Sequence, residues 1–376
     1  MAETPVWLLF VAFSCLPLLP WCRGGDEAAV KGMFVFGSSL VDNGNNNFLR
    51  NSKARADYSP YGIDFPWGPS GRFSNGRNPV DVLGQLLMLP SLIPPFADPK
   101  TKGRRIAHGV NYASGGSGIL DHTGSLTGEV MNLSTQIGNF EDKTLPELKA
   151  QLGKGGSRRV VANRFLSQYL FVVGTGGNDY LLNYFAGDDN NSTILSEFTR
   201  HLVSILSAQL KKLYDLGARK FVLFSIQAMG CVPVVRANVP TAKGGCVEAM
   251  NEAAILFNSR LRRLADASRR RRMPGSFVVY VNSYKIIRDI INNPIRSGFS
   301  ETSEACCELS SATEDGRGIL CRRGGRACGD RDAHVFFDGL HPTDAVNMRI
   351  AVKAYGSNLK AEAYPMNVGQ LARLST

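Results

Sequence analysis

The sequence predicts an α/β fold of three layers, in which a mostly parallel sheet carries helices on both faces. Two observations lead to this prediction. Short apolar runs typical of buried strands recur along the chain, and long stretches of helical periodicity separate them. No linker divides the chain, and its 376 residues, 44% of them hydrophobic, suffice for one large core. We therefore expect a single domain over 26–376.

The first predicted strand is the apolar run Met33–Phe36. Gly37 ends it, Ser38 and Ser39 follow where the backbone turns, and the turn-forming residues 42–47 prevent the strand from continuing. A serine at the carboxyl end of a central strand is well placed for nucleophilic attack, because open α/β sheets bind ligands there. The alternative is an ordinary polar turn after a strand.

Further strands and helices alternate after this turn. We expect strands at 109–113, 169–174, 221–226 and 277–281, and helices at 80–87, 126–148, 196–216, 249–272 and from Pro342 onward. The clearest helix, 196–216, has an apolar stripe and Gly217 just after its end. Pro342 at the first position of the last helix and Asp344 in its first turn are both favourable there. The segment 56–90 is rich in Gly, Pro and aromatic residues, which predicts a surface loop of the kind that often lines a site.

The chain opens with a segment typical of a secretory signal. An apolar run over Val6–Trp21 contains two prolines and is followed by small residues, which is the layout of a hydrophobic region and its cleavage site. The residues before that run include an acid but no Lys or Arg, and a membrane anchor or a buried helix is the alternative. We expect residues 1–25 to be a signal peptide cleaved around Gly24 or Gly25. The mature protein would then be extracellular, in the apoplast or cell wall, without a transmembrane segment.

The six cysteines after that segment indicate disulfides. They are Cys231, Cys246, Cys306, Cys307, Cys321 and Cys328. An even number of cysteines in a secreted chain favours pairing. Local pairing of Cys231 with Cys246 is expected, and the last four are expected to pair among themselves. A zinc site is disfavoured, because no CxxC spacing and no histidine cluster would complete one.

The chain carries an excess of positive charge and two sequons for N-glycosylation. The net charge is +11, and its densest run, Arg269–Arg272, ends a helical pattern, where cations are favourable. We interpret that run as a solvated helix end that also favours peripheral contact with anionic cell-wall or membrane surfaces, and we expect no nucleic-acid binding. Sequons at Asn132 and Asn190 fit a secreted glycoprotein.

A second polar motif, Asp338–His341, supplies a base for the serine. Residues three apart on a tight or helical turn face the same way, so Asp338 can bond one ring nitrogen of His341. The other nitrogen would then take the proton of Ser39, which is the arrangement that acyl transfer requires. Of the five histidines, His341 alone combines an acid at this spacing with a following helix start. A capping histidine is the alternative.

Tetrahedral chemistry also needs donors for an oxyanion. Asn178 offers an amide at the end of the strand 169–174, and Gly115 offers a backbone N–H in the glycine-rich run 114–118. The N–H of Ser39 would complete a hole with three donors. Asn and Gly are common turn formers, so each signal alone is weak.

These residues together resemble the plant GDSL esterase/lipase family of SGNH hydrolases. The matching segments are 34–47, 109–119, 171–179 and 337–343, with supporting matches at 216–224, 229–233 and 283–285. The resemblance covers essentially the whole mature chain and implies a flavodoxin-like SGNH hydrolase fold. It also implies a carboxylic-ester hydrolase with Ser39 as nucleophile, His341 as base and Asp338 as orienter. Ser39, Gly115 and Asn178 would form the oxyanion hole, and no metal or organic cofactor is needed.

The chain departs from the family pattern at two positions. The family tetrapeptide Gly-Asp-Ser-Leu reads Gly37-Ser38-Ser39-Leu40 here. In the family, we expect the acid of this tetrapeptide to accept hydrogen bonds from nearby backbone N–H groups. Ser38 can accept such a bond only as a neutral group, and bonds to a charged acceptor are stronger, so we predict a looser site here. Phe337 stands where the family commonly has Trp, and it should keep an aromatic wall while losing an indole donor.

Two functions follow from these patterns. The first is a secreted serine esterase or lipase that acts on acyl lipid, acetylated polysaccharide or phenolic esters. The alternative, motivated by Ser38, is a catalytically impaired secreted scaffold that binds lipid or cell-wall glycan. Nucleotide binding at residues 174–177 is disfavoured, because the glycines there lack the GxGxxG spacing.

Overall fold

The computed structural model of the protein describes residues 29–153, 165–186, 194–239, 245–311 and 318–375. The predicted signal peptide and the sequon at Asn190 lie outside these ranges. Within them, no helix has both the length and the apolar character that a membrane crossing demands.

A five-stranded sheet forms the centre of the molecule, with strand order β1-β2-β3-β4-β7. Its strands are β1 (Gly32–Gly37), β2 (Tyr169–Gly174), β3 (Lys220–Phe224), β4 (Phe277–Val281) and β7 (Ala363–Tyr364). The first four run parallel, and β7 pairs antiparallel with β4. Gly37 and Gly174 are register partners, so the loops after β1 and β2 leave the sheet side by side. A small separate sheet joins β5 (Glu301–Ala305) to β6 (His334–Phe336).

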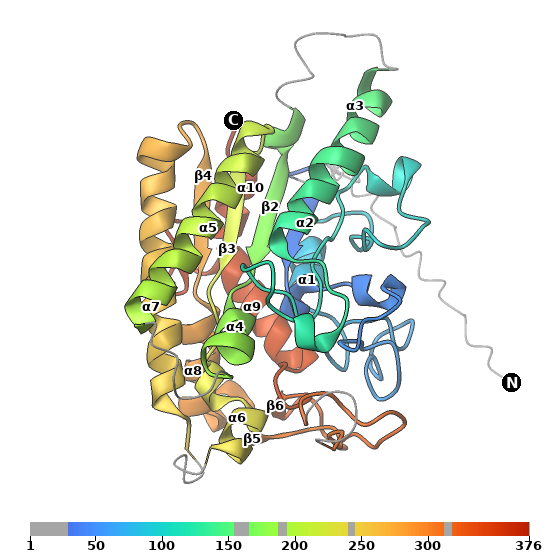
Figure 1. The fold of residues 1–376 in the computed structure, drawn as a ribbon, viewed down its shortest axis with the longest axis vertical. Helices are drawn as coiled ribbons and strands as arrows, with labels where there is room; N and C mark the ends of the chain where they lie inside the picture. The colour runs from blue at the N-terminus through green and yellow to red at the C-terminus, as the bar shows by residue number, and fades with distance from the viewer. Residues whose placement is uncertain (1–28, 154–164, 187–193, 240–244, 312–317, 376) are drawn as a thin grey trace, which may run out of the picture.

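Helices cover the sheet on both sides, which confirms the predicted three-layer α/β class (Figure 1). One layer contains α2 (Leu133–Asn139), α5 (Leu195–Asp215) and α7 (Glu248–Ala267), and the other contains α1 (Pro79–Leu86), α9 (Asp344–Gly356) and α10 (Val368–Arg373). The remaining helices are α3 (Leu145–Gly153), α4 (Gly177–Asp179), α6 (Pro233–Asn238) and α8 (Ser283–Asn292).

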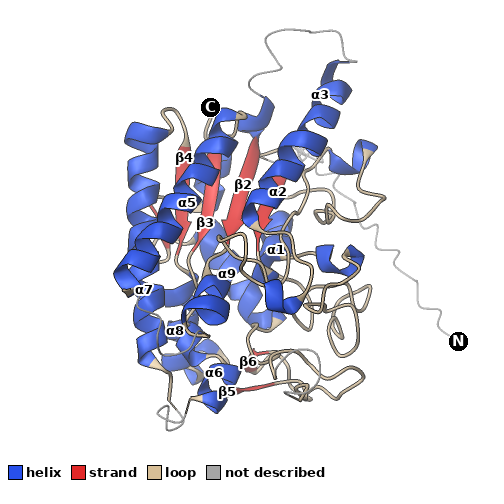
Figure 2. Cartoon of the chain, viewed as in Figure 1, coloured by secondary structure: helices blue, strands red, loops and turns tan. Residues whose placement is uncertain are grey.

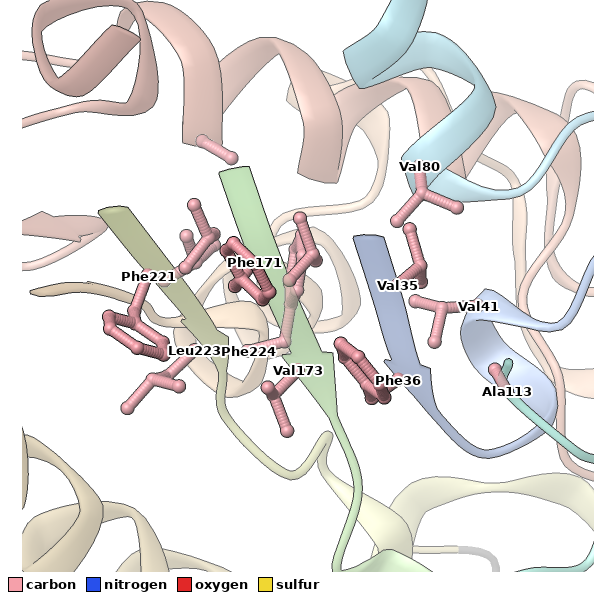
Figure 3. Close-up of a cluster of buried hydrophobic side chains, with 14 of the residues drawn as sticks. Val35, Phe36, Val41, Val80, Ala113, Phe171, Val173, Phe221, Leu223 and Phe224 are labelled. Carbon is pink, nitrogen blue, oxygen red and sulfur yellow. The ribbon is translucent and has the colours of Figure 1, made fainter. Parts of the chain in front are cut away.

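The core lies between these layers and is built on the apolar strands (Figure 3). Every residue of β1 and β2 is buried, as expected for parallel strands covered on both faces. Phe36 stacks on Tyr112 with ring centroids 5.0 Å apart, and Phe171 lies against Phe36 and Phe221. This packing fixes the strand ends from which the site loops emerge.

The predicted bounds of one strand and two helices need correction, at 109–113, at 126–148 and from Pro342. The segment 109–113 is not a full strand. It follows β1 through backbone bonds such as Tyr112 N–H to Val35 O, while its other side meets Pro94 and Pro95, and a proline nitrogen cannot extend a ladder. The helix expected over 126–148 starts only at Leu133.

That later start reflects the cap of α2. The Asn132 side chain accepts from the Thr135 N–H at 2.9 Å, and its amide nitrogen donates to the carbonyl of Asp121. This asparagine of the predicted sequon is therefore engaged in capping. The helix expected from Pro342 begins at Asp344 instead, because Pro342 pairs with Phe336 in an isolated bridge. That helix is also followed by β7 and α10 rather than ending the chain.

Two long loops lie together beyond the carboxyl ends of the strands (Figure 2). Residues 49–78 form one loop, and the described residues 306–311 and 318–333 belong to the other, called the disulfide loop below. Disulfides join Cys306 to Cys328, Cys307 to Cys321 and Cys231 to Cys246, which confirms the expected pairing. The Tyr58 hydroxyl donates to the Cys321 carbonyl, so the loop after β1 is bound to the disulfide loop.

Candidate active site

The nucleophile candidate follows β1 in a turn that only glycine permits. Gly37 has φ 148°, and a Cβ there would lie 2.2 Å from the Gly174 carbonyl oxygen. The Ser38 N–H donates to that same carbonyl at 3.0 Å, and Ser39 then opens a short 3-10 turn. The Ser39 side chain is consequently held at the carboxyl end of the central sheet.

Three side chains predicted to meet are in contact. The His341 Nε2 lies 2.7 Å from the Ser39 Oγ, and its Nδ1 lies 2.8 Å from Oδ2 of Asp338. The other oxygen of Asp338 accepts the backbone N–H groups of Leu340 and His341, at 2.8 and 2.7 Å. All three predicted residues are buried, and Asp338 completely so. Because a carboxylate only accepts, the proton lies on Nδ1 and Nε2 is free to accept from the serine.

A tyrosine from the loop after β1 supports the carboxylate. The Tyr61 hydroxyl donates to Oδ2 of Asp338 at 2.6 Å and accepts the Cys321 N–H at 3.1 Å. Burial, together with the neighbouring Asp338 charge, raises the pKa of Tyr61 well above its usual range, so the hydroxyl stays protonated and donates. Phe73 from the same loop lies with its ring centroid 4.9 Å from the His341 ring.

This loop belongs to the segment that the sequence predicted to line a site, but its contact with Asp338 was not foreseen. The only sequence signal is a tyrosine in a Gly-, Pro- and aromatic-rich stretch. Phe337 was expected to form an aromatic wall of the site. It is fully buried, its ring centroid lies 5.7 Å from that of Tyr61, and it does not line the cavity next to Ser39.

Of the predicted oxyanion donors, Asn178 lies at the cavity and Gly115 does not. Asn178, in α4 after β2, borders the same cavity as Ser39 and His341. One of its amide hydrogens is donated to the Ser117 carbonyl at 2.9 Å, which orients the group and leaves the second hydrogen available. Gly115 does not fit the role, because its N–H donates to a buried carboxylate at 2.9 Å and Gly115 does not line the cavity.

That carboxylate belongs to Asp42, which sequence reasoning assigned only to a turn. Its Oδ1 accepts the N–H groups of Gly44 and Asn45 at 2.7 and 2.9 Å, and its Oδ2 accepts that of Gly115. Burial raises its pKa to about 6, against the opposing effect of these N–H bonds. Asp42 thus joins the turn at residues 44–45 to the glycine-rich run 114–118.

Ser38 does not accept the backbone N–H bond that was expected of it. Its hydroxyl has no hydrogen-bond partner in the described part of the chain, and the side chain lines the cavity beside Ser39. The charged acceptor of this region is Asp42, which accepts the N–H groups of Gly44, Asn45 and Gly115. A carboxylate therefore holds the residues that follow the turn of the nucleophile candidate.

The cavity next to Ser39 has a volume of about 50 Å³. Its wall includes the apolar side chains of Leu40, Leu181, Ile226, Met229 and Leu340. Its polar lining consists of Ser38, Ser39, Thr175, Asn178, Ser225, Gln227 and His341. A small, neutral part of a ligand would fit this mixture of surfaces.

Comparisons with known proteins identify the family to which the chain is similar. A family model described as GDSL-like Lipase/Acylhydrolase matches residues 33–353. The chain is 41% identical over 369 residues to the GDSL esterase/lipase At1g29670 of Arabidopsis thaliana, covering 96% of this chain and 98% of the relative. It is 42% identical over 376 residues to the GDSL esterase/lipase At5g08460 of the same plant, covering 96% and 94%.

Proposed function

This chain belongs to the GDSL-like lipase/acylhydrolase family, and we propose that it is a secreted carboxylic-ester hydrolase that uses Ser39, His341 and Asp338. The observation that carries the proposal is the 2.7 Å contact between Ser39 Oγ and His341 Nε2, which joins residues 302 positions apart. A serine, a base and an orienter in this order are the requirements for covalent acyl transfer.

The contacts support a reaction in two halves. Ser39 Oγ attacks the ester carbonyl while Nε2 of His341 takes its proton, and Asp338 stabilises the resulting imidazolium. The histidine then gives that proton to the departing alcohol, which leaves an acyl group on the serine. Water, deprotonated by His341, attacks the acyl carbonyl, and Ser39 recovers its proton as the acid is released.

Charge on the tetrahedral oxygen needs donors that are already in place. We assign this role to the Ser39 N–H and to the free amide hydrogen of Asn178, whose other hydrogen is held by Ser117. Gly115 is not part of this assignment, because Asp42 accepts its N–H.

Secretion is part of the same proposal. It rests on the signal-like segment 1–25 ahead of a single domain over 26–376, and on the three disulfides, which are typical of oxidising compartments. The substrates in this proposal are esters of acyl lipids, acetylated polysaccharides or phenolic acids. The alternative is a catalytically impaired scaffold that binds lipid or cell-wall glycan, and its motive is Ser38 in place of the family acid.

The decisive experiment compares Ser39→Ala with Ser38→Ala, which removes the neighbouring hydroxyl. Hydrolysis of p-nitrophenyl acetate and labelling by a fluorophosphonate should both disappear in Ser39→Ala, with a loss of kcat of at least about 1,000-fold. Ser38→Ala should still be labelled. Equal rates for the wild type and Ser39→Ala would overturn the assignment.

A further inference from the structure

Two buried polar atoms at the cavity have no hydrogen-bond partner among the described residues. They are Oγ1 of Thr175 and Oε1 of Gln227. Thr175 follows β2 and Gln227 follows β3, so they come from the ends of adjacent parallel strands. Both residues line the cavity that also contains Ser39 and His341.

The chemistry of these two atoms is defined by their surroundings. The Gln227 Nε2 donates to the Leu340 carbonyl at 3.0 Å, which fixes the amide orientation and makes Oε1 an acceptor without a donor. The Thr175 hydroxyl, on a side chain only 8% exposed, can donate or accept. Leaving such a group unpaired is unfavourable, so native proteins keep few of them without a functional reason.

The lining also restricts what could pair with these atoms. It includes no Lys, Arg, Asp or Glu, and most of the remaining wall is apolar. A phosphate or carboxylate would find no cation there, and its oxygens would meet the Gln227 acceptor unfavourably. A neutral hydroxyl has the groups that both residues need, because it can donate its hydrogen to Gln227 Oε1 and accept the hydrogen of the Thr175 hydroxyl.

We propose that Thr175 and Gln227 form a subsite for a hydroxyl group near the scissile ester. The preferred substrates are then esters that keep a free hydroxyl, such as those of a partly acylated sugar or polyol, rather than purely alkyl esters. This inference rests on the proposed function and specifies its substrate class. The hydroxyl can belong to the alcohol or to the acid, and the experiment separates the two.

The test uses two pairs of esters that differ only by O–H in place of CH₃. The pair 2-hydroxyethyl acetate and propyl acetate places the hydroxyl on the alcohol, and the pair ethyl glycolate and ethyl propanoate places it on the acid. Values of kcat/KM from acid release are divided by the rates of hydroxide-catalysed hydrolysis, which removes intrinsic reactivity. The full chain should favour the hydroxylated member of one pair by about 5-fold, since a neutral hydrogen bond contributes about 1 kcal/mol.

Variants then locate the preference. Gln227→Met and Thr175→Val should each bring the ratio close to one, whereas Thr175→Ser, which keeps the hydroxyl, should retain it. The matched control is Gln168→Met, because Gln168 is exposed and precedes β2 at the opposite end of the sheet. A ratio is used because it is insensitive to a general loss of activity, and either of the two main variants suffices if the other does not fold.

The outcomes distinguish this inference from the proposed function. If the wild type hydrolyses p-nitrophenyl acetate but shows a ratio of one in both pairs, the subsite is refuted and the esterase stands. A preference that survives in both Gln227→Met and Thr175→Val also refutes it. If the wild type neither hydrolyses p-nitrophenyl acetate nor reacts with fluorophosphonate, the proposed function fails, and the subsite fails with it.

Discussion

The Tyr61 hydroxyl donates a 2.6 Å hydrogen bond to Oδ2 of Asp338, the same oxygen that Nδ1 of His341 contacts at 2.8 Å. Tyr61 in turn accepts the N–H of Cys321, a residue of the disulfide loop. The carboxylate that orients the histidine is therefore positioned by two loops that are far apart in the sequence. In the proposed mechanism, Tyr61 acts through Asp338 and is a positioning residue.

Removing that hydroxyl should slow the chemical step. Tyr61→Phe is expected to lower kcat for p-nitrophenyl acetate about tenfold and to change KM less than about threefold, because a hydrogen bond to a charged group contributes about 1.5–3 kcal/mol. Tyr58→Phe is the matched control, since Tyr58 bonds the Cys321 carbonyl rather than Asp338. An equal kcat in the two variants would contradict the positioning role.

Asn178 should matter only when charge develops on the carbonyl oxygen. Asn178→Ala is expected to lower kcat by about 100-fold to 1,000-fold with little change in KM, as for other lost oxyanion donors. Asn183→Ala is a suitable comparison, because its amide bonds the Thr123 hydroxyl away from the cavity. A fall in kcat of less than about fivefold for Asn178→Ala would remove this residue from the oxyanion hole.

Restoring the family acid should have little effect. Ser38→Asp is expected to leave kcat within about threefold of the wild type, because Asp42 already accepts the loop N–H groups with a full charge. Steady-state kinetics with p-nitrophenyl acetate and butyrate would measure this. A rise in kcat of tenfold or more would show that Ser38 impairs the site. It would then favour the alternative function, a catalytically impaired scaffold that binds lipid or glycan.

Asp42 predicts a pH-dependent component of stability. Its pKa is raised from 3.8 to about 6 in the folded protein, so the folded state binds the proton more tightly than the unfolded state. Its contribution to stability is therefore fully present below about pH 4 and is lost as the pH rises through 6, by up to about 3 kcal/mol. Asp42→Asn cannot titrate, so the wild-type minus Asp42→Asn difference in unfolding free energy should fall over this range.

Urea unfolding of both proteins at pH 4, 5, 6 and 7 measures that difference. The substitution also replaces one accepting oxygen by an NH2 group, which cannot accept an N–H, and this shifts the whole curve without changing its slope against pH. A difference that stays constant from pH 4 to pH 7, or that rises, would contradict the raised pKa.

The sequence by itself determined the class of the fold and the pieces that carry the proposed chemistry. Apolar runs locate β2 and β4 at their observed bounds, and the apolar stripe locates α5 to within a residue. These features are local, because burial of one strand or one helix face leaves a periodic trace in the chain. The predicted contact of Ser39 with His341 is also confirmed, with His341 in the segment between β6 and α9.

Only the tertiary structure decided which loop groups are free and which are already bonded. Nothing in the order of residues shows that Asp42 occupies the N–H of Gly115, or that Tyr61 reaches Asp338 across 277 positions. The same is true of the unpaired atoms of Thr175 and Gln227 at the cavity. The physical reason is that a polar loop residue leaves no periodic signal, and its partner is set by how distant loops pack.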